Sequence, residues 1–161
     1  MPTSNVMDIH VAMHGSAGVL SNLHKHSFIF DGVQCGGMEG LIQSLRYKNV
    51  DEQLHMAGLY GIQAKRLGDK KNWRAKQELY WKGVPFNRHS DAYQVFLDNA
   101  YDALAIQSER FRSALIDSDG KILTHTVGRT DPYITLLTQE EFLCRLNRLR
   151  SSLMTLRCAG E

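Results

Sequence analysis

The sequence predicts a single domain of mainly α, α+β type, in which helices dominate and a few short strands complete the fold. Three observations support this prediction. Apolar residues recur at helical spacing along most of the chain, whereas apolar-polar alternation is limited to short stretches. The 161 residues, 43% of them hydrophobic, suffice for one core and are too few to expect two. No repeat, linker or low-complexity segment divides residues 1–161.

The N-terminal part of the chain contains two predicted strands. Residues 6–13 (VMDIHVAM) alternate between apolar and polar side chains, which is typical of a short strand. Residues 26–32 (HSFIFDG) indicate a second strand that runs into an Asp-Gly turn.

The first predicted helix begins at residue 38, within the segment GGMEGLIQSLR. Its apolar residues recur at helical spacing, and the neighbouring face carries Glu39, Gln43 and Arg46. An acidic residue is favoured in a first helical turn because the helix dipole and the unpaired N–H groups attract negative charge. Glu39 therefore has a structural explanation as well as a catalytic one.

Two further helices are predicted in the middle of the chain. The first covers residues 49–68, with Asn49 as its N-cap and Gly68 as its stop, although two glycines weaken its interior. The second lies within residues 72–81 and is followed by an exposed loop with Gly and Pro.

The C-terminal half is predicted to hold the longest helices. Ser90 can cap a helix over residues 91–116, which either is continuous or bends near Gln107. The segment DSDGKILTHTVG indicates a turn into a short strand. Thr138 and Glu141 then stand at capping-box spacing before the apolar pattern of a C-terminal helix.

Composition narrows the class of protein. The 19 basic and 17 acidic residues are spread along the chain and leave a net charge of +2, so no basic tail or stripe predicts general adhesion to nucleic acid. A small anionic ligand remains compatible with this charge. No secretory signal and no apolar stretch near 20 residues is present, which predicts a cytoplasmic protein without a membrane partner.

Cysteine and histidine spacing predicts no metal site. The three cysteines, Cys35, Cys144 and Cys158, include no CxxC pair and fit free thiols in a reducing compartment. His24 and His26 alternate along the chain without a third ligand at a suitable spacing.

From residue 19 onward the chain resembles the NADAR or YbiA-like family. Ser21 and Asn22 are similar to the opening Ser-Asn pair of the family, and residues 28–32 to the strand and turn that follow it. The family helix Glu-His-x-x-Gln-Ala-x-Lys is matched at Glu39 and Gln43, and Arg46 stands where the family has Lys.

Further segments carry the resemblance, with departures. Gly40 stands where the family has His. Residues 64–68 (AKRLG) resemble an Ala-Lys-x-Leu-Gly segment that includes Lys65, and Trp81 falls where a tryptophan follows it. Near the end of the chain the family has an Asp-x-x-Trp-Gly element. Here only Asp131 could correspond to its Asp, and the Trp-Gly pair is absent.

The resemblance implies a YbiA-like helical fold and hydrolysis of ribosyl N-glycosidic bonds without a cofactor. The substrates of such proteins are nucleotide-like: riboflavin-pathway intermediates, or ADP-ribose carried on guanine bases of nucleic acid. Compact members of the family resemble phage proteins. Because part of the last motif is missing, a binding module that has lost hydrolysis, or a host-interaction protein, is the alternative.

Cleavage of a ribosyl C–N bond passes through an oxocarbenium-like state, which calls for a proton donor or a nearby negative charge. The resemblance assigns this role to Glu39, as an acid/base or as a stabiliser of the cation. Asp131 is the candidate second acid, although an Asp-Pro pair more commonly forms a turn. His125 is the less favoured substitute for it.

The remaining candidates would bind the substrate. Ser21, Asn22 and Gln43 are suited to hydrogen bonds with ribose or phosphate, and Arg46 and Lys65 to ion pairs with phosphates. Trp81 could stack on a base or pack in the core, whereas Trp73 is expected only to pack.

Overall fold

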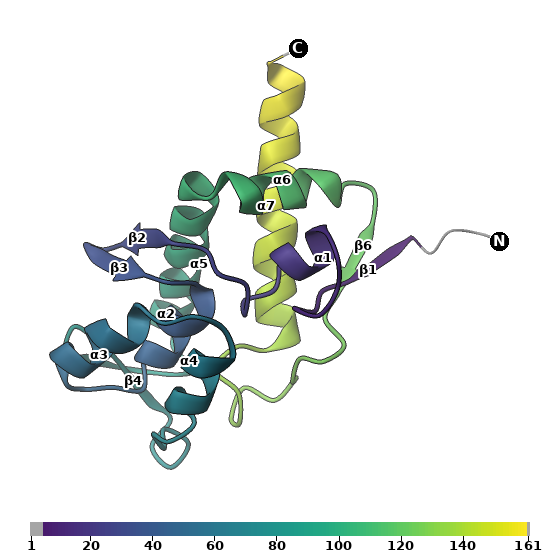
Figure 1. Ribbon diagram of the computed structural model, residues 1–161. Coiled ribbons are helices and arrows are strands. Elements are labelled where there is room, and N and C mark those ends of the chain that lie inside the picture. The colour runs from purple at the N-terminus through teal and green to yellow at the C-terminus, as the bar shows by residue number, and fades with distance from the viewer. Residues whose placement is uncertain (1–4, 161) are drawn as a thin grey trace.

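The computed structural model describes residues 5–160 and confirms the mainly helical α+β fold (Figure 1). Short strands form three separate two-stranded sheets among the described residues. In chain order the elements are β1 (Val6–Asp8), α1 (Ser16–Val19), β2 (Phe28–Phe30), β3 (Val33–Cys35), α2 (Met38–Ser44), α3 (Val50–Ala57), α4 (Gly61–Gly68), β4 (Glu78–Trp81), β5 (Val84–Asn87), α5 (Asp91–Gln107), α6 (Glu109–Asp117), β6 (Ile122–Thr124) and α7 (Gln139–Ala159).

The core lies around α5 and α7, which run upright through the middle of the molecule (Figure 1). The short helices α2, α3 and α4 form a group beside α5, and α6 crosses above, where the C-terminal half of α7 projects beyond the rest of the fold. The parallel pair β1 and β6 joins the N-terminal segment to the chain just before α7. This arrangement brings the chain ahead of α7 close to α2 and α4.

Helix caps predicted from the sequence are confirmed. The side chains of Asn49 and Ser90 accept the backbone N–H groups that begin α3 and α5. Thr138 and Glu141 form the complete capping box of α7. These caps are local interactions, which is why the sequence alone reveals them.

Of the two alternatives for residues 91–116, the structure has the bend near Gln107. Helix α5 ends at Gln107, and Ser108 leaves the helical conformation with φ −104° and ψ 105°. Its hydroxyl then accepts the N–H of Phe111 and begins α6. Residues 91–116 therefore form two helices.

Two predictions for the middle of the chain are wrong. Residues 49–68 form α3 and α4 rather than one helix, because the backbone near Gly58 packs against Gly36 and Gly40 of the preceding segment. Residues 72–81 contain no α-helix: the hairpin β4–β5 replaces it, with Lys82 and Gly83 both at positive φ in the two-residue turn.

The same turn geometry extends the predicted strand at residues 26–32 into a hairpin. Asp31 and Gly32 both have positive φ, so the chain reverses and β3 pairs with β2. The sequence identified the turn but not the strand that follows it.

No helix among the described residues is both long and apolar enough to cross a membrane. The three cysteines are free: Cys35 is buried, and Cys144 and Cys158 are exposed. The side chains of His24 and His26 are both engaged within the protein, with Arg110 for the first and with Ser108 and the Val19 carbonyl for the second.

Gly40, which stands where the resembled family has His, has no space for a side chain. A Cβ atom at this position would collide with the backbone carbonyl of Leu59. We therefore expect Gly40→Ala to lower the free energy of unfolding by about 3 kcal/mol, since backbone must move to make room. Urea unfolding monitored by circular dichroism measures this loss.

Gly58→Ala is the matched control. Gly58 has an ordinary helical φ of −74°, and its Cβ would have no neighbour closer than 3.5 Å. We expect a change below about 1 kcal/mol for it. Equal stability of the two variants would contradict the close approach at Gly40.

Candidate active site

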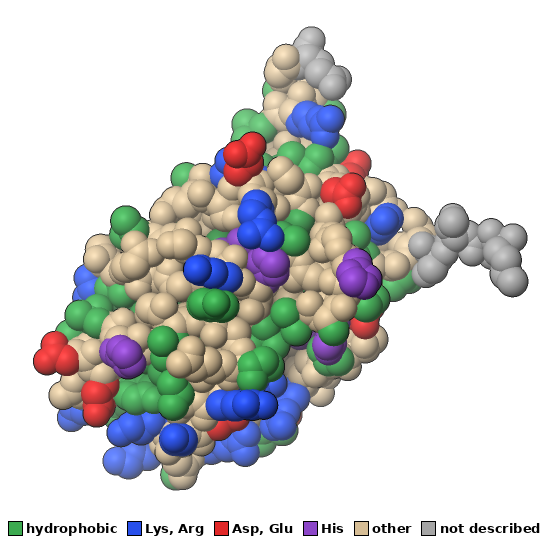
Figure 2. Space-filling model, in the orientation of Figure 1, with side chains coloured by type: hydrophobic (Ala, Val, Ile, Leu, Met, Phe, Trp, Pro, Cys, Tyr) green, Lys and Arg blue, Asp and Glu red, His purple; other side chains and the backbone are tan. Residues whose placement is uncertain are grey.

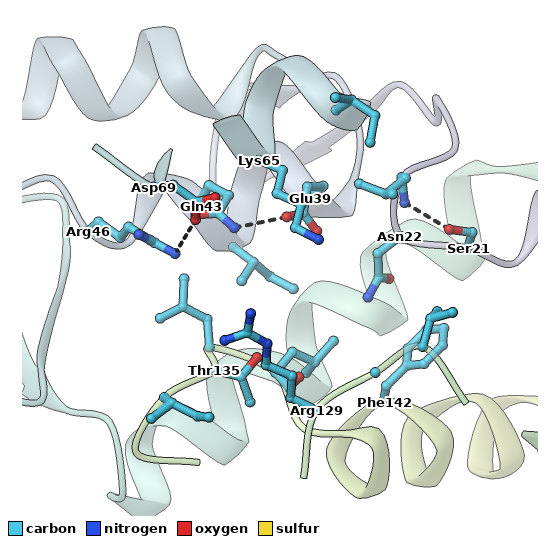
Figure 3. A pocket seen from close by; sticks show the side chains of 18 of the residues that line it. Ser21, Asn22, Glu39, Gln43, Arg46, Lys65, Asp69, Arg129, Thr135 and Phe142 are labelled. Atoms are coloured by element: carbon cyan, nitrogen blue, oxygen red, sulfur yellow. Dashed lines mark hydrogen bonds and ion pairs between the residues drawn. The ribbon is translucent and has the colours of Figure 1, made fainter. Parts of the chain in front are cut away.

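A cavity of about 620 Å³ lies between the α2–α4 group on one side and the segment ahead of α7 on the other (Figure 3). Its wall includes six of the eight site residues predicted from the sequence, which are Ser21, Asn22, Glu39, Gln43, Arg46 and Lys65. Trp81 and Asp131 are not among the residues that line it. The structure thus brings together the residues of the N-terminal signature and separates them from the other two.

Trp81 lies in an aromatic cluster elsewhere. Its ring packs against Phe30 and Phe96, with ring centroids 5.6 and 5.3 Å away, and its indole N–H donates to Asp31 at 2.9 Å. Trp73, for which only packing was expected, is 4% exposed and forms part of the cavity wall. The tryptophan that a ligand in this cavity would meet is therefore Trp73.

Asp131 forms a turn at the surface. Its side chain is exposed, and its Oδ1 accepts the backbone N–H of Tyr133 at 2.9 Å. The cavity consequently holds only one of the two predicted acids, Glu39.

Glu39 stands in the first turn of α2 and is half-buried. Its Oε1 accepts a hydrogen bond from Gln43 Nε2 at 2.8 Å, one helical turn on. Burial raises the pKa of the Glu39 carboxyl above its ordinary value, against the opposing effects of the Gln43 hydrogen bond and of the positive charges on Lys65 and Arg46. A raised pKa favours the protonated form of the carboxyl, which is the form that can donate a proton.

Gln43 is held by close packing. Its Oε1 is buried and has no hydrogen-bond partner among the described residues. Any Cβ at position 68 would collide with this oxygen, so only glycine at Gly68 allows α4 to pack against the amide. The glycine predicted as a helix stop thus also shapes the cavity wall.

The Arg46 side chain binds the segment at the end of α4 and just after it. Its Nη1 donates to the carbonyls of Gly68 and Lys71 at 2.8 and 3.1 Å, and its Nη2 pairs with Asp69 at 3.3 Å. The guanidinium therefore has partners of its own, and Lys65 remains the predicted cation with no hydrogen bond or ion pair to another described residue. The role of Arg46 toward phosphate stays a prediction.

Asn22 is fixed from two directions. The buried Tyr101 hydroxyl donates to Asn22 Oδ1 at 2.7 Å, and the Asn22 carbonyl accepts the backbone N–H of Glu39 at 3.2 Å. Because Oδ1 is occupied by Tyr101, the amide nitrogen turns into the cavity, as Figure 3 shows. Asn22 thus offers N–H donors to a ligand beside Glu39.

Ser21 is bound locally. It is 4% exposed, and its Oγ accepts the backbone N–H of Leu23 at 3.2 Å. This interaction shapes the turn that presents Asn22.

Cations outnumber carboxylates in the cavity wall. Sequence reasoning missed Lys71, Arg74 and Arg129, and Figure 3 shows Arg129 pointing into the cavity from the side opposite Glu39. The lining cations are Arg46, Lys65, Lys71, Arg74 and Arg129, and the lining carboxylates are Glu39 and Asp69. The charges surrounding Glu39 therefore favour an anionic ligand.

His125 is a further group in the wall suited to proton transfer. Its Nδ1 lies 2.8 Å from the carbonyl of Ile9, and because a carbonyl only accepts, Nδ1 carries the hydrogen. Its Nε2 then has a free lone pair and no hydrogen-bond partner among the described residues. The ring also packs edge-on against Phe142, with ring centroids 4.9 Å apart, which holds its orientation.

This architecture is a YbiA-like fold. The solution structure of YbiA from E. coli matches 97% of the chain and 89% of its own length, with a TM-score of 0.63 and 15% sequence identity. Such low identity shows a common fold and does not transfer an activity.

Sequence comparison gives the family. Residues 15–151 match the family described as bacteriophage protein GP30.3, and the chain belongs to this family. A relative in Enterobacteria phage T4, described as an uncharacterised 17.1 kDa protein in the Gp30–rIII intergenic region, is 44% identical over 138 residues, which cover 83% of this chain and 90% of the relative.

Proposed function

We propose that the protein hydrolyses the N-glycosidic bond of a nucleotide-like or ADP-ribosylated substrate. The observation that carries the proposal is a half-buried carboxyl of raised pKa, Glu39, in a cavity whose other charged side chains are mainly cations. A proton donor meets the need of the leaving base, and cations meet the need of phosphate groups. The YbiA-like fold supports the same reaction class by analogy.

In the proposed reaction the bond between C1′ and the base nitrogen breaks, and Glu39 donates its proton to the departing base. The ribosyl C1′ takes on oxocarbenium character, which the carboxylate left on Glu39 stabilises. Asn22 Nδ2 donates to an oxygen of the ribose, in the orientation fixed by Tyr101.

His125 acts as the general base in this reaction, because Asp131 lies at the surface outside the cavity. Its free Nε2 takes a proton from the attacking water as the water oxygen bonds to C1′. The products are a ribose with a hydroxyl at C1′ and the released nucleobase, which carries the proton from Glu39. The protonated His125 then returns its proton to solvent, and Glu39 is protonated again.

Phosphates of the substrate are placed among the free cations. Lys65, Arg74 and Arg129 line the cavity, and their side chains form no hydrogen bond or ion pair with another residue in the described part of the chain. Arginine can bind a phosphate through two parallel hydrogen bonds, which would orient the ribose with respect to Glu39.

His125→Asn tests the assignment of the base. Asn keeps a donor near the position of Nδ1 for the Ile9 carbonyl but lacks Nε2, so we expect kcat to fall by about 100-fold without loss of the fold. Candidate substrates are ADP-ribose, NAD, ADP-ribosylated DNA and riboflavin-pathway ribosyl intermediates, with base release followed by mass spectrometry.

His55→Asn is the control, because His55 is an exposed residue of α3 outside the cavity. Its kcat should equal that of the wild type. A His125→Asn enzyme with unchanged kcat and an unchanged pH profile would reject His125 as the base.

A binding module without hydrolysis is the second candidate, favoured by the position of Asp131 outside the cavity. It predicts that ADP-ribose raises the melting temperature while no base is released from any substrate. Release of base excludes it.

A further inference from the structure

A row of six cations borders the cavity. Residues 65–76 contain Lys65, Arg66, Lys70, Lys71, Arg74 and Lys76, which we call the basic rim, and a single acidic residue, Asp69. All six side chains are exposed. The even spread of charge expected from the overall composition therefore does not hold for this segment.

The positive charge of the basic rim is not neutralised within the protein. None of its six side chains forms a hydrogen bond or ion pair with another residue that the structure describes. Lys71 lies over the ring of Tyr47, 5.4 Å from its centroid, which leaves its charge in place. The one acid of the segment, Asp69, is already paired with Arg46 at 3.3 Å.

The basic rim leads from the cavity to the outer surface. Lys65, Lys71 and Arg74 line the cavity, whereas Arg66, Lys70 and Lys76 do not. Figure 2 shows Lys and Arg side chains gathered along the lower edge of the molecule, in the region that Figure 1 gives to α4 and the chain after it. A polyanion bound there would pass directly by the cavity mouth.

Exposed apolar and aromatic side chains flank the same mouth. Ile62 and Ile134 line the cavity and are 46% and 40% exposed. Tyr133, next to Ile134, is 60% exposed, and the centroid of its ring lies 4.1 Å from that of the His89 ring. An exposed aromatic ring beside a row of cations is a surface on which an unpaired base can stack.

We propose that the basic rim binds the sugar-phosphate backbone of single-stranded nucleic acid and thereby presents one nucleotide to the cavity. Helix α4 ends at Gly68, so two of the six cations lie in its last turn and four lie on the irregular loop that follows, rather than along a helix that could enter a groove. A nucleotide that enters a cavity must also leave its stack, which costs least in a single strand. What happens to that nucleotide rests on the proposed function; the binding does not.

Fluorescence anisotropy with a labelled single-stranded oligodeoxynucleotide of about 20 nucleotides tests the proposal. The variant Lys70→Glu/Lys76→Glu changes two rim cations outside the cavity wall. We expect its affinity at low salt to fall at least about tenfold, and the slope of log K against log salt to become shallower by about 1.4.

The control variant Lys121→Glu/Arg157→Glu reverses two exposed cations outside the rim and has the same net charge. Its affinity should stay within about twofold of the wild type. Equal losses in the two variants would mean that only total charge matters, and would overturn the proposal. Equal or tighter binding of a duplex, or binding only to vesicles with anionic lipids, would also overturn it.

The two proposals can fail separately. Hydrolysis of a free nucleotide-like substrate should be unchanged in Lys70→Glu/Lys76→Glu, because neither residue lines the cavity. Binding that depends on the rim without any hydrolysis would reject the proposed function and support the basic rim. Hydrolysis of free substrate without binding of single strands would do the reverse.

Discussion

Glu39→Gln is expected to abolish hydrolysis and, at the same time, to stabilise the fold. Gln has nearly the shape of Glu, and its carbonyl can still accept the hydrogen bond from Gln43. It cannot donate a proton to a leaving base, so we expect turnover to fall by about 1,000-fold or more. Base release measured by mass spectrometry at saturating substrate gives this loss.

The gain in stability follows from the raised pKa of Glu39. Burial raises the pKa in the folded state above that of the unfolded chain, so folding favours the protonated carboxyl. The wild type is then relatively most stable below the unfolded pKa and loses stability as the pH rises through the folded pKa. The amide that replaces the carboxyl in Glu39→Gln does not titrate. We therefore expect the variant to melt a few degrees higher, by about 2–4 °C for each kcal/mol, at neutral pH and no higher near pH 4.

Glu52→Gln is the matched control for both effects. Glu52 also lies in a first helical turn, that of α3, but it is exposed and outside the cavity. We expect neither turnover nor melting temperature to change appreciably in this variant. A Glu39→Gln protein that keeps its turnover would reject Glu39 as the proton donor, and one that is destabilised at neutral pH would reject the gain in stability expected from the raised pKa.

The half of the cavity formed by the N-terminal signature could be predicted because it depends on local spacing. Glu39 and Gln43 stand one helical turn apart in any helix that begins at residue 38, and they do form a hydrogen bond. Their burial could not be predicted in this way. It requires α4 to pack against the Gln43 amide, which depends on the glycine at position 68.

The other half depends on contacts between distant segments. Arg129 enters the cavity because the start of α7 fixes its loop: the N–H of Gln139 donates to the Arg129 carbonyl, and Gln139 Nε2 to the Gly128 carbonyl. The spacing of residues 128–139 in the sequence does not predict these hydrogen bonds.

The two tryptophans show the same limit of sequence patterns. Trp81 was the expected stacking residue, yet the hairpin β4–β5 directs it to Phe30 and Phe96, and the chain before the hairpin places Trp73 in the cavity wall.

The largest loss of stability is expected when Glu141 is replaced. Arg88, 1% exposed, donates to both carboxylate oxygens of Glu141, at 2.6 and 3.1 Å. Gln94 donates to the same carboxylate at 2.7 Å, and the Thr138 backbone N–H at 2.9 Å. One side chain therefore joins the residue that follows β5, helix α5 and the start of α7, the helix on which the cavity segment depends.

Glu141→Gln should lower the free energy of unfolding by about 3–5 kcal/mol, because it leaves the Arg88 guanidinium buried without its counter-charge. Glu140→Gln, at the exposed neighbouring position of the same first turn, should cost less than about 0.5 kcal/mol. Urea unfolding of both variants measures the difference. Similar values for the two would show that the ion pair adds little.

The pH dependence tests whether the charge of the Glu141 carboxylate is the source of the stabilisation. Burial raises the pKa of Glu141, but the hydrogen bonds from Arg88, Gln94 and Thr138 outweigh it and leave the pKa below the ordinary value. The stabilisation is therefore present above the unfolded pKa and is lost as the pH falls through the folded pKa. Glu141→Gln should remove this part of the acid sensitivity, so the stabilities of the wild type and the variant should converge at low pH. A difference that stays constant down to pH 3 would show that the charge of Glu141 is not the source of the loss.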